Sequence, residues 1–327
     1  MDNGNVIDDT LGWAGTGRMG YALAKRLLEH GFELAVYNRT RSKAEPLADV
    51  GACTIVDTAA DLADREIVFT MGAGDDDFRE LVLGPRGLLS REVRPRIIVD
   101  STTVSAEVSA EVRAGAERLG TDLLVAPVSG NPRVVEAGKL TYVVSGPEDA
   151  YRRVLPYLEL LGAGATYVGE GELARLAKIC HNLLLGTVAQ SLAEISVLAE
   201  KGGMSRAALF EFLNKSVMGS MFTRYKTPAY VNLDFHATFT PILLRKDFDL
   251  GFKSARELDV PMPVAAATLQ MVQALIGAGY REEDFATLLE LQAQLSDLEL
   301  ESENAAVTDG LGADAEVAKE PSAQPAR

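Results

Sequence analysis

Three glycines near the N-terminus have the spacing of a phosphate-binding loop. Gly15, Gly17 and Gly20 follow an apolar run at Thr10–Ala14 and open a segment with helical apolar spacing, Gly20–Glu29. In this strand–turn–helix context the first glycine permits a tight turn, the second lets the backbone approach a pyrophosphate, and the third lets helix and strand pack closely. We therefore predict a dinucleotide-binding loop made of Gly15, Thr16, Gly17, Arg18, Met19 and Gly20.

The residues after the second expected strand, Glu33–Tyr37, indicate which dinucleotide binds. NAD enzymes usually carry an acidic residue there for the ribose 2′-hydroxyl. This chain instead has Asn38, followed by Arg39, Thr40 and Arg41. A carboxylate would repel a 2′-phosphate, whereas a guanidinium binds it through paired hydrogen bonds. We expect NADP(H) to be preferred, with NAD(H) possible; the alternative is that both arginines are ordinary solvated loop charges.

A second group of residues could move a proton and hold an acid. Lys178 lies in an apolar segment, Glu172–Ala199, that predicts one long buried helix, and Asn182 lies four residues later on the same face. Burial would lower the pKa of a lysine and suit it to general acid–base work. Ser129 and Gly130 could hold a carboxylate through a hydroxyl and an amide. The alternatives are that Lys178 extends its ammonium group from the helix into solvent, and that Ser129 belongs to an ordinary turn.

The histidines and cysteines do not form a metal-binding pattern. Three His and two Cys are scattered along the chain, so we expect no metal. His30 would cap the end of a helix before a glycine, and His181 would either pack beside its helix or contact a substrate oxygen. We expect Cys53 and Cys180 to be buried thiols, as is usual in a reducing cytoplasm.

The order of segments predicts an α/β domain followed by an all-helical one. Strand-like runs alternate with helical segments up to residue 168, which predicts βαβ units and a mainly parallel sheet. The expected strands are Thr10–Ala14, Glu33–Tyr37, Ile67–Met71, Ile97–Asp100, Leu123–Pro127 and Thr141–Ser145. The expected helices after the long one are Arg206–Lys215, Leu243–Leu258, Pro263–Ala278 and Glu282–Leu300. The boundary should fall near Gly169–Gly171.

Composition and charge exclude several classes of partner. The net charge of −15 disfavours binding to nucleic acid or to an anionic membrane. We expect no membrane-spanning segment, and Met1–Asn5 lack the basic start of a signal peptide. Residues 300–327 are rich in Ala, Glu, Ser and Pro and lack aromatics, so we expect a disordered acidic tail. A soluble cytoplasmic protein fits these features.

Six short motifs occur in order along the chain: GTGRMG at 15–20, NRT at 38–40, DSTTVS at 100–105, APVSGNPRVVEAGKL at 126–140, KICHN at 178–182 and LLRKDFDL at 243–250. Together they resemble the β-hydroxyacid dehydrogenases, which include 3-hydroxyisobutyrate dehydrogenase and glyoxylate/succinic semialdehyde reductases. The resemblance implies a Rossmann domain, as in 6-phosphogluconate dehydrogenase, here expected over 6–169. It also implies an all-helical domain, expected over 170–299, and an oligomer, for which we expect a homodimer centred on the long helix.

The resemblance also assigns roles to individual residues. It implies that Lys178 is the general acid and base in hydride exchange between the nicotinamide and a small β-hydroxyacid, aldehyde acid or keto acid. Asn182 would help to bind this carboxylate or carbonyl substrate, and Ser129 and Gly130 would hold its carboxylate. The implied cofactor contacts are Thr103, Lys246 and the loop of Met71, Gly72 and Ala73.

Some residues depart from the family pattern. Asn131 stands where most members have a second glycine, and His181 replaces the first Asn of K-x-x-N-N. K-x-x-H-N also occurs in 6-phosphogluconate dehydrogenases, but the glutamate that they carry three residues later is Leu185 here. Two alternatives stay open: an imine reductase, which usually has Asp or Tyr in place of the lysine, and a non-catalytic dinucleotide-binding module. The presence of Lys178 argues against both.

Overall fold

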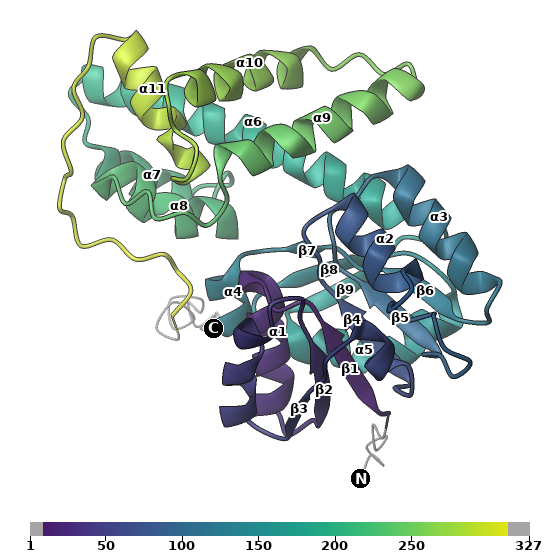
Figure 1. Cartoon of the computed structure of the whole chain (residues 1–327). Helices are drawn as coiled ribbons and strands as arrows, with labels where there is room; N and C mark the ends of the chain where they lie inside the picture. The colour runs from purple at the N-terminus through teal and green to yellow at the C-terminus, as the bar shows by residue number, and fades with distance from the viewer. Residues whose placement is uncertain (1–8, 313–327) are drawn as a thin grey trace, which may run out of the picture. The chain divides into compact units, whose positions relative to one another are not determined.

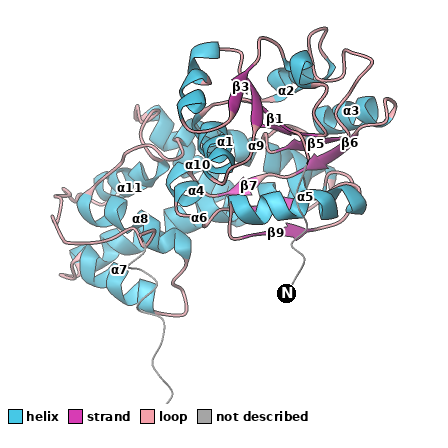
Figure 2. Ribbon diagram, turned by 90° about the horizontal axis from the view of Figure 1, so that it is seen from below, coloured by secondary structure: helices cyan, strands magenta, loops and turns pink. Residues whose placement is uncertain are grey.

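The computed structural model describes residues 9–312 of the chain. The chain divides into two compact units between Lys178 and Ile179, which we call the N-terminal and C-terminal units. The segment Met1–Asn5 and the residues after 312 lie outside the described residues. Figure 2 shows that the strands belong to the N-terminal unit, while the C-terminal unit consists of helices and connecting loops.

A six-stranded parallel sheet organises the N-terminal unit (Figure 1), with the strand order β3-β2-β1-β4-β5-β6. The strands are β1 Leu11–Ala14, β2 Leu34–Tyr37, β3 Cys53–Ile55, β4 Ile67–Thr70, β5 Ile97–Asp100 and β6 Asp122–Val125. Every residue of β1, β4 and β5 is buried, so both faces of the sheet are covered. This is the doubly wound dinucleotide-binding arrangement, and the order reverses beside β1, where the glycine loop follows. The predicted fold class is confirmed.

Helices cover this sheet in two groups. Helix α1 packs with α4 and α5, whereas α2 packs with α3. Their bounds are α1 Arg18–Glu29, α2 Asp75–Leu83, α3 Ala106–Glu117, α4 Pro132–Glu136 and α5 Glu148–Leu161, with 3-10 turns η1 Arg41–Lys43, η2 Glu45–Asp49 and η3 Ala59–Leu62. At the end of α1, His30 is the C-cap, and its Nδ1 lies 2.7 Å from the carbonyl oxygen of Arg26.

A second, three-stranded sheet follows β6. Strand β7, Val128–Ser129, pairs antiparallel with β8, Thr141–Val144, which pairs parallel with β9, Gly164–Tyr167. The late strand expected at Thr141–Ser145 is thus present, but it belongs to a separate sheet. Ser129 thus lies in β7, an edge strand of this second sheet.

Helix α6, Leu173–Lys201, begins in the N-terminal unit and continues into the C-terminal unit. The compact units divide within this helix, later than the expected boundary at Gly169–Gly171. The reason is that Arg175 fixes the first turns of α6 to the N-terminal unit by buried hydrogen bonds. By length and composition α6 could cross a membrane, contrary to our reading of the sequence, but half of its most apolar stretch is buried inside the fold, as in a core helix.

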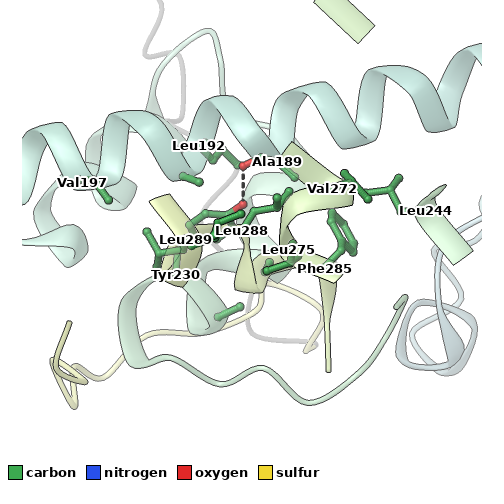
Figure 3. Packing of buried hydrophobic residues seen from close by; sticks show 14 of the residues in the cluster. Ala189, Leu192, Val197, Tyr230, Leu244, Val272, Leu275, Phe285, Leu288 and Leu289 are labelled. Carbon is green, nitrogen blue, oxygen red and sulfur yellow. Dashed lines mark hydrogen bonds between the residues drawn. The ribbon is translucent and has the colours of Figure 1, made fainter. Parts of the chain in front are cut away.

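The remaining helices form the C-terminal unit: α7 Arg206–Lys215, α8 Met221–Asn232, α9 Pro241–Glu257, α10 Pro263–Gly277, the 3-10 turn η4 Phe285–Thr287 and α11 Leu288–Leu295. Figure 3 shows their shared core, in which leucine, valine and aromatic side chains from these helices pack against α6. The Tyr230 hydroxyl reaches this core and donates to the Ala189 carbonyl oxygen at 2.7 Å.

Two helices of this unit differ from expectation. The helix expected at Glu282–Leu300 is split and shorter, because the buried Asp284 carboxylate accepts from the Ala286 amide and begins a new 3-10 turn. It ends at Leu295, and Asp297 adopts a positive φ of 51° that breaks the helix. Helix α8 was not predicted; it contains Pro228, and a capping box between Ser220 and Thr223 begins it.

The expectation of a disordered tail from residue 300 is wrong for residues 300–312. This segment, yellow in Figure 1, runs along the C-terminal unit. The Glu303 carboxylate accepts hydrogen bonds from the Arg206 and Ala207 amides, which begin α7. Asn232 forms two hydrogen bonds of 2.9 Å with the Ala305 backbone. The acidic residue that composition assigned to solvent therefore serves as a helix cap.

The two cysteines are both free thiols. Cys53 is half-buried, and burial raises the pKa of its thiol to about 11, which makes it a poor nucleophile. Cys180 is exposed on α6, so the expectation that it is buried is wrong.

Candidate active site

The glycine loop after β1 is held so closely that two of its positions admit only glycine. Gly15 has a φ of +103°, and a Cβ there would lie 2.2 Å from the Met71 carbonyl oxygen. A Cβ on Gly20 would lie 2.0 Å from the Gly15 carbonyl oxygen. At Gly17, by contrast, no heavy atom lies within 4 Å of a Cβ, so its backbone faces open space. This difference matches the roles predicted for the three glycines.

The start of α1 fits a dinucleotide pyrophosphate. Gly17 is the N-cap of α1, which has no side-chain cap and no acidic residue in its first turn. The Thr16 hydroxyl beside it is buried and, within residues 9–312, makes no hydrogen bond. Amide groups at a helix start attract phosphate, and a buried hydroxyl without a partner can add one more donor. Arg18 and Met19 form the first turn of the same helix.

Asn38 ties the end of β2 to the glycine loop. Its Oδ1 accepts from the Thr16 amide at 2.8 Å, and its Nδ2 donates to the Thr40 carbonyl oxygen at 2.8 Å. A carboxylate could not make the second of these bonds, because it has no donor. The arginines that follow form exposed ion pairs: Arg39 pairs with Asp77 and Arg41 with Asp57, each at 2.6 Å.

The loop of Met71 and Gly72 after β4 is anchored by a buried polar network that our sequence reasoning missed. The Gly72 amide donates to Thr102 Oγ1 at 2.8 Å, and that hydroxyl donates to Asp100 Oδ1 at 2.7 Å. The Thr70 hydroxyl donates to the same carboxylate oxygen at 2.8 Å. An acidic residue at the end of an otherwise apolar strand was the signal in the sequence. Thr103, the predicted cofactor contact, is the next residue and is half-buried.

Arg175 completes this network from helix α6. Its Nη2 donates to Asp100 Oδ2 at 2.8 Å and its Nη1 to the Thr102 carbonyl oxygen at 2.7 Å. Both charged side chains are buried, at 4% and 0% exposure. The network therefore connects the loop beside the cofactor site to the first turn of the helix that carries Lys178. Sequence reasoning passed over Arg175, although it lies only three residues before Lys178.

Lys178 lies next to the loop predicted to hold a carboxylate. Its Nζ donates to the Val128 carbonyl oxygen at 2.7 Å, directly before Ser129 and Gly130. Gly130 has a φ of +143°, and a Cβ there would lie 2.8 Å from Leu140 Cδ1. Asn131, whose departure from the family pattern had no explanation in the sequence, is the N-cap of α4 and accepts from the Val134 amide at 3.1 Å.

The C-terminal unit contains Asn182, His181 and Lys246. Asn182 and Asp247 are buried, and the Asn182 amide nitrogen donates to Asp247 Oδ2. This bond turns the Asn182 amide oxygen toward His181, whose Nδ1 lies 2.8 Å from it. The Nδ1 of His181 must then carry the proton. Lys246 lies half-buried on α9, directly before Asp247. Among residues 9–312, no group of His, Cys, Asp and Glu could hold a metal ion.

Comparison with known proteins bears on both units. Residues 10–169 match the family model for the NAD-binding domain of 6-phosphogluconate dehydrogenase. Residues 171–292 match the model described as NAD-binding of NADP-dependent 3-hydroxyisobutyrate dehydrogenase. An uncharacterized oxidoreductase of Shewanella frigidimarina is 34% identical over 269 residues, which cover 80% of this chain and 92% of that protein.

Two solved structures agree with these matches. A structure of Psf3 in complex with NADP+ and 2-OPP aligns with a TM-score of 0.77 and 25% identity, covering 86% of this chain and 99% of that chain. A Mycobacterium tuberculosis 3-hydroxyisobutyrate dehydrogenase with L-serine aligns with a TM-score of 0.75 and 26% identity, covering 86% and 98%. The chain therefore belongs to the β-hydroxyacid dehydrogenase family and is an NAD(P)-dependent oxidoreductase of the 3-hydroxyisobutyrate dehydrogenase type, acting on a CH–OH group.

Proposed function

We propose that this enzyme interconverts a small β-hydroxyacid and the matching aldehyde acid or keto acid with NADP(H), and that Lys178 transfers the proton. The observation that carries the proposal is the 2.7 Å hydrogen bond from Lys178 Nζ to the Val128 carbonyl oxygen. It fixes an ammonium group beside Ser129 and Gly130, whose hydroxyl and amide suit a carboxylate. A substrate that has a carboxylate for Ser129 and Gly130, and a nearby hydroxyl or carbonyl oxygen for Lys178, fits these groups.

The dinucleotide supplies or accepts the hydride when it is bound. The residues of the chain do the rest. Ser129 and Gly130 hold the carboxylate, and Lys178 gives a proton to the carbonyl oxygen as it becomes a hydroxyl, or removes it in the reverse direction. Within the C-terminal unit, Asp247 and His181 already orient the Asn182 amide, so that amide would lose little freedom on binding a substrate oxygen.

The proposed preference for NADP(H) rests on Arg39 and on the missing acid at Asn38. Asn38 joins the glycine loop to Thr40 and adds no negative charge at the end of β2. Arg39 stands next to it with an 80% exposed side chain. A related solved structure contains NADP+. A guanidinium in this position suits a 2′-phosphate better than a 2′-hydroxyl.

We also propose a cytoplasmic homodimer, with no nucleic-acid or membrane partner. Leu184 and Leu198 of α6 are exposed by 63% and 73%, which leaves apolar area that a second copy can cover. The two free thiols suit a reducing compartment. Light scattering at micromolar concentration tests the dimer; a monomer would contradict it.

A spectrophotometric panel tests the proposed reaction. The purified enzyme is given NADPH or NADH with small aldehyde acids and keto acids, with cyclic imines, or with no substrate. We expect oxidation of NADPH only with the acids, and slower oxidation of NADH. Turnover of imines alone would favour an imine reductase, and tight dinucleotide binding without turnover of any compound would favour a non-catalytic module.

A further inference from the structure

An acidic side chain forms an ion pair with Arg39, the residue that we propose as the contact for a 2′-phosphate. Arg39 Nη1 donates to Asp77 Oδ1 at 2.6 Å. The Asp77 side chain is 33% exposed and lies in the first turn of α2, which follows β4. NAD enzymes carry an acidic residue at the end of the second strand, where this chain has Asn38. Here a carboxylate from a different element, Asp77 of α2, instead contacts the neighbouring Arg39.

Asp77 differs from the two acids that precede it. Asp75 accepts from the Ser105 amide at 2.9 Å and from its hydroxyl at 2.7 Å. Asp76 is fully exposed and pairs with Arg79 at 3.0 Å. Of these three consecutive acids, Asp77 is the one that the structure pairs with Arg39.

We propose that Asp77 determines how strongly the enzyme discriminates between the two dinucleotides. The proposal rests on the proposed NADP(H) site at Arg39. A 2′-phosphate bound at Arg39 must share the guanidinium with the Asp77 carboxylate, which is bonded to Nη1, and must remain near its negative charge. The 2′-hydroxyl of NAD(H) is neutral and meets no such repulsion. Asp77 therefore weakens NADP(H) binding selectively and keeps NAD(H) usable.

The size of the effect follows from simple electrostatics. An exposed ion pair contributes little by itself, so it does not prevent phosphate from binding. The repulsion remains: a doubly charged phosphate about 5 Å from a carboxylate in water at physiological salt loses roughly fivefold in affinity. Removing the charge of Asp77 should therefore strengthen NADPH binding by about fivefold and leave NADH binding nearly unchanged.

The test compares Asp77→Asn with Asp76→Asn. Both variants remove one charge from the same helical turn and keep the side-chain shape, but only Asp77 contacts Arg39. Dissociation constants for NADPH and NADH are measured by cofactor fluorescence on the full-length protein, after circular dichroism has shown that both variants are folded. We expect the NADPH-to-NADH affinity ratio to rise in Asp77→Asn and to stay at the parent value in Asp76→Asn.

Two outcomes would overturn the inference, and they are distinguishable. If the parent binds both dinucleotides and the two variants show the same affinity ratio, Asp77 has no role in selectivity, and the proposed enzymatic function stands. If the parent binds neither dinucleotide, the proposed function fails together with this inference.

Discussion

The three glycines of the loop after β1 are required for different physical reasons. Gly15 and Gly20 lack room for a Cβ because carbonyl oxygens of the same unit lie 2.2 and 2.0 Å from its position. Gly17 has an ordinary backbone conformation with φ −63° and ψ 179° and has space for a methyl group. The fold therefore needs the first and third glycines, while only the approach of a phosphate requires the second.

This distinction predicts that two matched substitutions affect different properties, cofactor binding in one case and stability in the other. Gly17→Ala should leave the melting temperature close to that of the parent and weaken dinucleotide binding by at least about tenfold, because the methyl group occupies the approach to the α1 amides. Gly20→Ala should destabilise the protein by about 1–3 kcal/mol through overpacking. Thermal melts and cofactor fluorescence check both. Equal melting temperatures for the two variants would contradict this account.

Single residues also show where sequence reasoning succeeds and where it stops. The glycine loop was predicted because its residue types and spacing are local, whereas Lys178 and Ser129 were singled out by motifs that resemble a known family. Asp100 and Arg175 were missed because they lie 75 positions apart, and their pairing depends on how β5 and α6 come together. The partner of Arg39 was missed for the same reason, since Asp77 is 38 residues away.

At the scale of elements, the first turns of α6 are fixed by the buried pair of Arg175 and Asp100. The same Asp100 accepts from Thr70 and Thr102, and Thr102 accepts from the Gly72 amide. One carboxylate thus sets both the loop after β4 and the helix turn that precedes Lys178. In most of the chain, the apolar periodicity of the sequence predicted whether a segment forms a helix or a strand. The starts of α8 and η4, by contrast, depend on hydrogen bonds of particular side chains.

This arrangement predicts a strong coupling between the two charged residues. Asp100→Asn alone removes the buried counter-charge of Arg175 and leaves only the Glu172 carboxylate, which lies 3.2 Å from Arg175 Nε. It should lower the free energy of unfolding by up to about 3–5 kcal/mol. The double variant Asp100→Asn/Arg175→Met removes both charges and should recover part of that loss. Urea denaturation of the parent, both single variants and the double variant measures the coupling. Strictly additive losses would show that the pair is not a unit.

At the scale of the whole molecule, the residues after α11 belong to the fold of the C-terminal unit. Glu303 caps α7, and the completely buried Arg206 donates to the carbonyl oxygens of Glu301 and Val231. Leu298, Leu300, Ala305 and Val307 pack against the core of this unit. Composition alone predicted a solvated tail here, because average hydrophobicity does not reveal a few specific contacts made by a segment of low apolar content.

Two truncations separate the ordered segment from the rest of the tail. A chain ending at Leu300 keeps the N-cap Ser205 but loses the two Glu303 bonds to the α7 amides and one acceptor of Arg206. Its unfolding free energy should fall by about 2–4 kcal/mol. A chain ending at Gly312 keeps all of these contacts and should match the parent. Thermal and urea denaturation of both truncated chains and of the parent measures these changes in stability. Identical stability for the two truncations would show that the docked segment contributes nothing.

Lys178 is the residue that we propose to transfer the proton in catalysis. Lys178→Met keeps most of the side-chain volume and removes the ammonium group that contacts Val128. On the acid substrate that the parent turns over best, we expect kcat to fall by at least about a hundredfold, while the dissociation constant for NADPH stays within a factor of about two because the α1 amides and Arg39 remain in place. Turnover by Lys178→Met at the rate of the parent would contradict this mechanism.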